Sequence, residues 1–181
     1  MDIRLLSQKT PNPNALKFIL NIDVRRGGKA TFEHDGTDPL VPLAKKLMGL
    51  SGVMQVHFFE NTITVTQDGS RPWQDLDGEV EEVLCDELET HDPNFVLPED
   101  IIKVHTSPDL VEIEQILDES IRPALQADGG DIELLKLDGD VLSVRYQGAC
   151  GSCPSSMYGT LQAIESTLRD RFRPTLEVVI A

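Results

Sequence analysis

A proline-bearing stretch near the middle of the chain limits what either half can fold into. The stretch HDPNFVLPEDIIKVHTSP covers residues 91–108 and carries three prolines without a helical hydrophobic period. Proline removes a backbone hydrogen-bond donor, and segments of this kind commonly act as linkers. We therefore predict two small domains, residues 1–91 and 109–181, joined by a linker over residues 92–108.

The charge of the chain excludes several classes of partner. Its 181 residues include 31 Asp and Glu against 16 Lys and Arg, for a formal net charge of −15. Nucleic acids and anionic membrane surfaces both bind clustered Lys and Arg, so we expect neither as a partner. No run reaches the roughly 18–20 apolar residues that span a bilayer. With three cysteines and no secretory signal pattern, we expect a cytoplasmic protein, or a mitochondrial-matrix one if the chain is processed.

The first domain has the pattern of a small α+β unit. Turn residues precede an apolar strand, and a loop containing Gly27 and Gly28 is expected after it. Two adjacent strands are expected around a turn at Glu60-Asn61, the second of which alternates threonine and apolar residues, and two further segments have helical spacing. The expected strands cover residues 16–24, 53–59 and 62–66, and the expected helices cover 39–50 and 73–90.

The second domain is also predicted to be α+β, with the order helix, strand, strand, helix, strand. The first helix should be kinked at Pro123, and the Asp138-Gly139 pair predicts a tight hairpin. The expected helices cover residues 111–125 and 157–172, and the expected strands cover 132–137, 141–146 and 176–180. Such a domain is close to the size at which a core is marginal without a metal or a partner.

One motif carries chemistry. The second strand of the hairpin leads into GACGSCPSS, which places Cys150 and Cys153 in a glycine-containing loop just before a helix. Unpaired N–H groups and the dipole at a helix N-terminus favour the thiolate form of cysteine. Both metal binding and redox exchange require thiolates.

Four interpretations of this pair remain open. Small buried hydrophobes are one, but two cysteines in such a loop are better ligands than core residues. Structural zinc needs four ligands, and no histidine follows His105, so zinc would require a dimer. A thiol–disulfide oxidoreductase of the thioredoxin type has a Cys-x-x-Cys before a helix, but too little chain follows Cys153 to complete that sheet.

The fourth interpretation is an iron–sulfur cluster. Such clusters usually take four cysteine thiolates, and two copies of the chain would supply them from Cys150 and Cys153. The count therefore predicts a homodimer bridged by a cluster, either [4Fe-4S] or [2Fe-2S]. A cluster held at a surface loop between subunits is suited to a carrier or scaffold.

At these residues the sequence resembles a known family. Residues 110–181 are similar to the NifU-like C-terminal domain of the Nfu family, through IRPALQADGGDIELL and GACGSCPSSMYGTLQAIESTL. Residues 1–90 are similar to the Nfu N-terminal domain, through TPNPNALKF and PLAKKLMGLSGVMQVHFFENTITVT.

The resemblance implies an iron–sulfur assembly protein rather than an enzyme. It would carry a cluster, usually [4Fe-4S], on Cys150 and Cys153 of each subunit. Its implied partners are upstream cluster-assembly proteins and apo-protein clients such as lipoyl synthase-like and aconitase-like enzymes.

Other residues have simpler interpretations. Cys85 is expected to behave as a small hydrophobe on a helix, and Trp73 to anchor that helix in the core. Gly129-Gly130 is expected to stop a helix, with Asp128 and Asp131 as caps or turn residues. The four histidines lack metal-ligand spacing and are expected at the surface or in packing.

Overall fold

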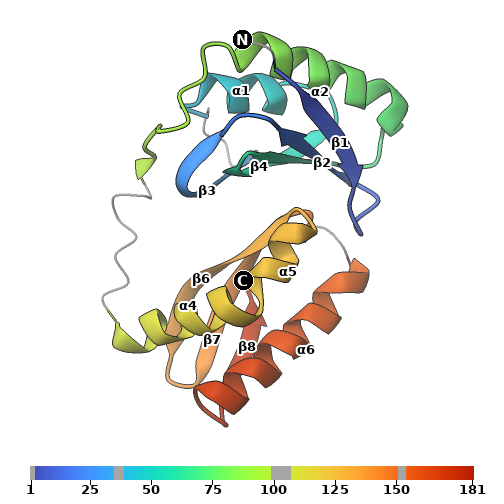
Figure 1. The fold of residues 1–181 in the computed structure, drawn as a ribbon. Helices are drawn as coiled ribbons and strands as arrows, with labels where there is room; N and C mark the ends of the chain where they lie inside the picture. Colours follow the sequence, from blue (N-terminus) through green and yellow to red (C-terminus); the bar gives the residue numbers. More distant parts are fainter. Residues whose placement is uncertain (1–2, 35–38, 99–106, 151–153) are drawn as a thin grey trace.

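The first domain is built on an antiparallel sheet. The computed structural model describes residues 3–34, 39–98, 107–150 and 154–181. The five strands lie in the order β1-β2-β5-β4-β3 and every neighbouring pair is antiparallel. They are β1 (Leu5–Lys9), β2 (Ala15–Leu20), β3 (Arg25–Glu33), β4 (Val53–Glu60) and β5 (Thr62–Gln67). Two helices, α1 (Pro42–Met48) and α2 (Trp73–Glu87), cover one face of this sheet (Figure 1).

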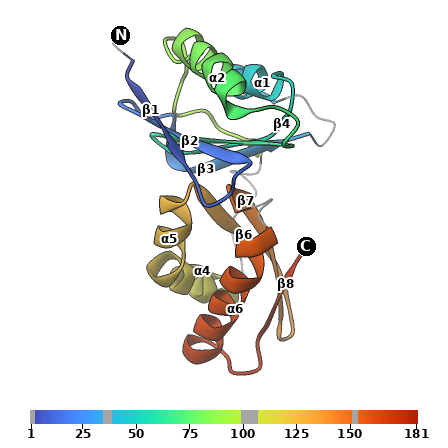
Figure 2. The same cartoon turned by 90° about the vertical axis from the view of Figure 1, so that its right-hand side faces the viewer.

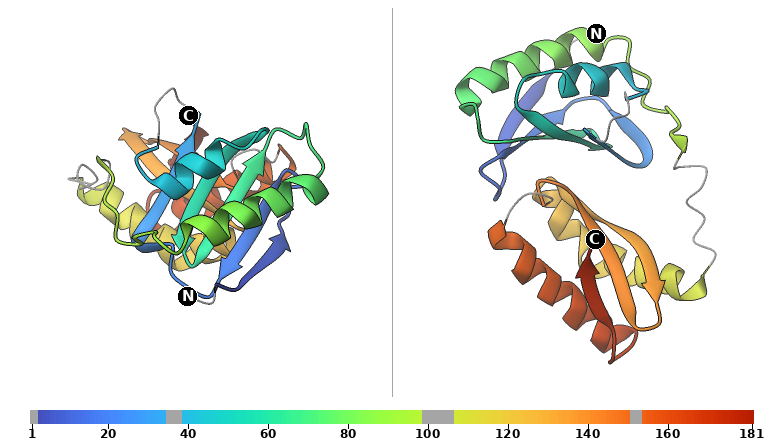
Figure 3. Two further views of the ribbon diagram at one scale, coloured as in Figure 1. Left: turned by 90° about the horizontal axis from the view of Figure 1, so that it is seen from above. Right: turned by 180° about the vertical axis from the view of Figure 1, so that it is seen from behind.

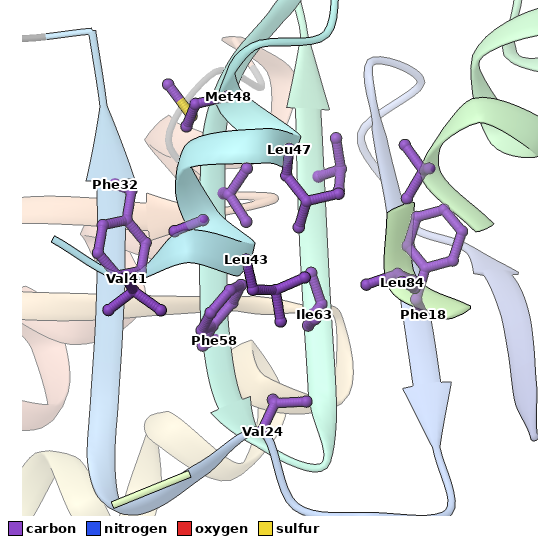
Figure 4. Packing of buried hydrophobic residues seen from close by; sticks show 14 of the residues in the cluster. Phe18, Val24, Phe32, Val41, Leu43, Leu47, Met48, Phe58, Ile63 and Leu84 are labelled. Carbon is purple, nitrogen blue, oxygen red and sulfur yellow. The ribbon is translucent and has the colours of Figure 1, made fainter. Parts of the chain in front are cut away.

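The core of this domain lies between the sheet and those helices. Alternate strand residues point at the helices, because successive side chains of a strand face opposite sides. Figure 4 shows Phe58 and Ile63 of the sheet packed near Leu43 and Leu47 of α1, and Phe18 beside Leu84 of α2. All six side chains are at most 1% exposed. Trp73 packs against this core as predicted, and its Nε1 donates to the carbonyl of Pro13.

Two strands of this sheet, β1 and β3, were not predicted from the sequence. We expected a loop at Gly27 and Gly28, but both lie inside β3. The pairing of β3 with β4 shifts register between Arg25 and Lys29, and both glycines have positive φ, 76° and 122°. Glycine tolerates such an irregularity within a ladder, so the Gly-Gly pair marks a bulge rather than the end of a strand. The other missed strand, β1, is a five-residue edge strand without an alternating apolar pattern.

The start of the predicted linker packs on the first domain. Leu97 is buried in its core and Phe95 contacts Phe32 and Phe58. His91 Nε2 lies 2.7 Å from the carbonyl of Val24. Residues 99–106 of the linker lie outside the described residues, and the boundaries that we set from the sequence stay predictions.

The second domain has the predicted order of elements. Helices α4 (Pro108–Ser120) and α5 (Arg122–Ala127) are followed by β6 (Gly130–Asp138), β7 (Val141–Gly148), α6 (Pro154–Arg171) and β8 (Glu177–Ile180). The first predicted helix is divided at Ile121, two residues before Pro123, which cannot continue the backbone ladder. The sheet order is β6-β7-β8, with an antiparallel hairpin and a parallel β7–β8 pair. Both domains are thus α+β, as expected.

The sheet of the first domain separates its own helices from the second domain. Figures 1 and 2 show α1 and α2 on one face of this sheet and the β6–β7 end of the second domain against the other. The reverse view in Figure 3 shows the same stacking. Within the described ranges, no helix is both long enough and apolar enough to cross a membrane.

Candidate functional site

Cys150 lies just past the end of β7, in the loop that leads to α6. Gly148 ends the strand with a φ of +62°, which glycine adopts without steric penalty. Ala149 is buried, and its amide donates to the carbonyl of Gly129 at 3.0 Å. Cys150 itself is half-buried and packs at the edge of the domain core. The strand and its glycine thus hold this thiol at the boundary between core and surface.

The second predicted ligand, Cys153, lies outside the described residues, together with Gly151 and Ser152. The helix that we expected after the cysteine pair is present, since α6 begins at Pro154. Within the described ranges, no group of three or more His, Cys, Asp or Glu side chains is placed to hold a metal ion.

Gly130 provides the space that Cys150 occupies. A Cβ atom on Gly130 would lie 2.3 Å from Cys150 Sγ and 2.9 Å from its backbone nitrogen. The two glycines that we assigned together to a helix stop therefore have separate roles. Gly129 does end α5, with φ +79° and an amide that donates to Gln126. Gly130 begins β6, and a glycine in a strand can signal close approach of other atoms.

Tyr146 of β7 lies near the thiol, four residues before Cys150 in the chain. Its side chain is buried, and burial raises the pKa of Tyr146 to about 12, with a smaller contribution from negative charge on Cys150. The phenol therefore stays neutral at physiological pH.

Cys85 does not join this site. It is exposed on α2, on the helix-covered side of the first sheet, whereas the end of β7 that leads to Cys150 lies against the opposite face (Figure 1). Our expectation of a small hydrophobe was also wrong. Leu84 takes the buried position on α2, and the next residue along a helix points about 100° away, here toward solvent.

Three polar side chains of the first domain donate to backbone carbonyls of the second domain, at the end that leads into the cysteine loop (residues 150–153). Asn12 Nδ2 donates to the carbonyl of Ala149 at 2.9 Å. Lys17 Nζ donates to the carbonyl of Ala127 at 2.5 Å, and Lys29 Nζ donates to that of Ile132 at 2.6 Å. These contacts join residues more than a hundred positions apart, and no local sequence pattern predicts them.

Asp131 is the centre of a buried ionic cluster, not the cap or turn residue that we expected. Its side chain is 1% exposed, and its Oδ1 accepts bonds from Lys29 Nζ at 2.8 Å and Arg122 Nε at 3.1 Å. The amide of Ile132 donates to the same oxygen at 2.6 Å. Arg122 further pairs with Glu114 and Asp118 of α4. One carboxylate thus joins the two domains through Lys29 and holds α5 to β6 through Arg122.

The ionisation of this cluster follows from its contacts. Burial alone would raise the pKa of Asp131, but the charge and hydrogen bond of Lys29, followed by Arg122, hold it below its usual range. Burial lowers the pKa of Lys29 despite the opposing pull of Asp131. The first shift favours a charged pair and the second disfavours it. Because three donors converge on the carboxylate, we assign it as charged at neutral pH.

His57 is a buried histidine on the sheet face that meets the second domain. It is 2% exposed, its Nδ1 lies 2.8 Å from Thr31 Oγ1, and a Cβ on Gly148 would come within 3.3 Å of its ring. Burial lowers the pKa of His57 to about 4, against the attraction of Asp131 and with a smaller contribution from Lys29. The ring is therefore neutral at physiological pH, in agreement with our expectation of a packing role.

Acid should destabilise the protein through His57. Its native pKa of about 4 lies below the usual 6.5, so the unfolded chain binds a proton first as the pH falls. The contribution of neutral, buried His57 to the free energy of unfolding is therefore fully present above pH 6.5 and decreases as the pH falls toward 4. Between pH 7.5 and 5 we expect this residue to contribute about 2 kcal/mol of the loss. His57→Gln should remove that part, measured by urea unfolding with Trp73 fluorescence.

The exposed His34 offers the matched control. His34→Gln should leave the wild-type pH dependence intact. If the free energy of unfolding fell equally in the wild type and His57→Gln between pH 7.5 and 5, the assignment of the effect to His57 would be contradicted.

Family models match both domains of the chain. The model described as "Scaffold protein Nfu/NifU N terminal" matches residues 5–91, and the model described as "NifU-like domain" matches residues 113–179. The order of the two matches along the chain is the order that we inferred from the sequence motifs.

Full-length relatives show the same relationship. The Drosophila simulans "NFU1 iron-sulfur cluster scaffold homolog, mitochondrial" is 33% identical over 90% of this chain and 59% of its own length. The Arabidopsis thaliana "NifU-like protein 4, mitochondrial" is 33% identical over 90% and 60%. A NifU-like protein of Schizosaccharomyces pombe is 31% identical over 98% and 72%. The chain thus spans about three fifths of the first two relatives, and it belongs to the Nfu family, with an Nfu N-terminal domain and a NifU-like domain.

Proposed function

We propose that the protein is an iron–sulfur cluster carrier. Two copies hold one cluster between them, of the [4Fe-4S] type, through the thiolates of Cys150 and Cys153, and pass it to apo-proteins. The cluster is cargo, so the protein is not an enzyme. The relatives named as mitochondrial support the matrix rather than the cytoplasm as its compartment.

The placement of Cys150 carries the proposal. Its thiol is half-buried, lies in the loop before α6, and belongs to a domain that matches the NifU-like model. A half-buried thiol has one side fixed by its own domain and another side available to a cluster shared with a second copy. Gly130 leaves the room that fixes the first side.

The exchange of ligands explains release. Each copy supplies two of the four thiolates, so neither copy alone completes the site. A client thiolate that replaces one of them lets the cluster leave stepwise, without a change in the oxidation state of the protein. A site at a surface loop allows such an approach, whereas an enclosed site would oppose it.

Native mass spectrometry of protein reconstituted with iron and sulfide under anaerobic conditions tests the proposal. We expect a dimer whose excess mass equals one cluster of four iron and four sulfide ions, and its conversion to apo-monomer on chelation. A chain that stays metal-free and readily forms a disulfide would contradict the proposal and favour a thiol–disulfide oxidoreductase. A colourless zinc-bridged dimer that iron and sulfide do not displace would also contradict it.

A further inference from the structure

The outer face of the first-domain sheet is polar although it is buried. Residues on this face include Lys17 of β2, His57 of β4 and Thr64 of β5, each at most 8% exposed. Buried polar faces are unusual in a sheet whose other face already forms a core. The second domain covers the outer, polar face. Lys17 Nζ donates to the carbonyl of Ala127, and Thr64 Oγ1 lies 2.9 Å from a Cβ built on Gly129.

This contact covers the end of the second domain that carries the candidate ligand. Asn12 binds the carbonyl of Ala149, which is 3% exposed and directly precedes Cys150. Gly148, one residue earlier, lies against His57. Figures 1 and 2 show the end of β7 directed at the sheet in both views. The first domain therefore occupies space immediately beside the residues that lead into Cys150.

The contact between the two domains also has features that favour its opening. His57 Nε2, Thr64 Oγ1 and Thr66 Oγ1 of the sheet are buried without a hydrogen-bond partner in the described part of the protein, as is Gln147 Oε1 of β7. Buried polar atoms of this kind regain hydrogen bonds when water reaches them. The bonds that hold the contact come mainly from Asn12, Lys17 and Lys29. Opening thus exposes a polar surface and breaks a small set of defined interactions.

We propose that the first-domain sheet is a docking surface for the cysteine-bearing end of its own NifU-like domain, and that this contact competes with pairing of two copies around a cluster. The inference rests on the proposed function, because a shared site requires the two cysteine loops to face one another. In the closed form the sheet occupies one side of that loop. Opening frees that side for a second copy or for a client.

Charge reversal at Lys29 tests the contact without altering a ligand. Lys29 pairs with Asp131, so Lys29→Glu places a second carboxylate against one that is buried. Lys46→Glu is the matched control, because Lys46 pairs with Glu87 on the helix-covered side and its side chain is 56% exposed. Both variants make the same change in net charge.

Alkylation of the apo-protein by iodoacetamide, followed residue by residue with mass spectrometry, reports the open form. We expect Cys150 to react roughly tenfold faster or more in Lys29→Glu, since breaking a buried ion pair strongly shifts a two-state equilibrium. The exposed Cys85 should react equally in all chains and serves as the internal reference. X-ray scattering should show a larger radius of gyration for Lys29→Glu alone. Unchanged alkylation and scattering in this variant would overturn the proposal.

Asn12→Asp provides a second test with less risk to folding. It retains the oxygen that accepts from the amide of Asn14 but replaces the donor that faces Ala149 with another oxygen. We expect Cys150 to be alkylated faster in this variant too, as in Lys29→Glu. If Lys29→Glu fails to fold and Asn12→Asp reacts like the wild type, the proposal is overturned.

Anaerobic reconstitution of the same chains separates the two proposals. If opening assists pairing, Lys29→Glu should form the cluster-bridged dimer faster than the wild type and Lys46→Glu. Equal rates with faster alkylation would overturn the competition. Absence of a cluster in every chain would contradict the proposed function, while the alkylation and scattering results would still decide whether the domains dock.

Discussion

Replacing Cys150 by alanine is expected to abolish cluster binding while the fold survives. The thiol is half-buried at the edge of the core, so its loss removes a ligand and little packing. With Cys153 alone, two copies offer two thiolates instead of the four that a cluster normally takes. Iron and sulfide per dimer should fall to the background of protein that was never reconstituted, and circular dichroism should match the wild type.

Cys85→Ala is the control for this experiment. Cys85 is exposed on α2, away from the cysteine loop, so this variant should bind iron and sulfide like the wild type. A complete cluster in Cys150→Ala would contradict the ligand assignment. Loss of the cluster in Cys85→Ala would contradict the assignment of the site to the second domain.

Gly130→Ala should damage the site without touching a ligand. The added Cβ would meet Cys150 Sγ at 2.3 Å and the backbone nitrogen of Cys150 at 2.9 Å, so the loop itself must move. Overpacking of this kind costs about 1–3 kcal/mol, and we expect a loss of that size in the free energy of urea unfolding. We also expect faster loss of the reconstituted cluster to a chelator, because the thiol is displaced.

Gly78→Ala is the matched substitution. Gly78 lies in α2, and no atom is within 4 Å of the position that its Cβ would take. Alanine favours a helix interior over glycine, so this variant should gain about 0.5–1 kcal/mol and retain the cluster normally. Equal stability and equal cluster retention for Gly130→Ala and the wild type would contradict the close packing of Gly130 and Cys150.

Local pattern predicted most of the second domain. Its order of elements, the break before Pro123 and the hairpin at Asp138-Gly139 are all present. These features depend on the backbone preferences of a few neighbouring residues, such as proline and glycine, and can therefore be predicted from a short stretch of sequence. The same reasoning failed at Gly27-Gly28, because a glycine pair is compatible with either a loop or a bulge and only the partner strand decides.

The surroundings of the candidate site were beyond such reasoning. Asp131 stands beside two glycines and has the local signature of a turn, yet its partner Lys29 is about a hundred residues away. Nothing near Gly130 in the sequence shows that Cys150 Sγ will lie against it. The cysteine pair could be proposed as ligands from the sequence alone, because its two residues stand in one short loop. Contacts that depend on how two domains meet have no such local pattern.

The parallel pairing of β7 with β8 has a consequence for synthesis. The cysteine loop lies between these strands in the sequence, and β8 reaches its place beside β7 only after α6 has been made. Chains fold from the N-terminus during translation, at about 5–20 residues per second. Until β8 has been made and paired, β6 and β7 form only a two-stranded ribbon, which is marginally stable in water. A stable framework beside Cys150 is therefore complete only when β8 is in place.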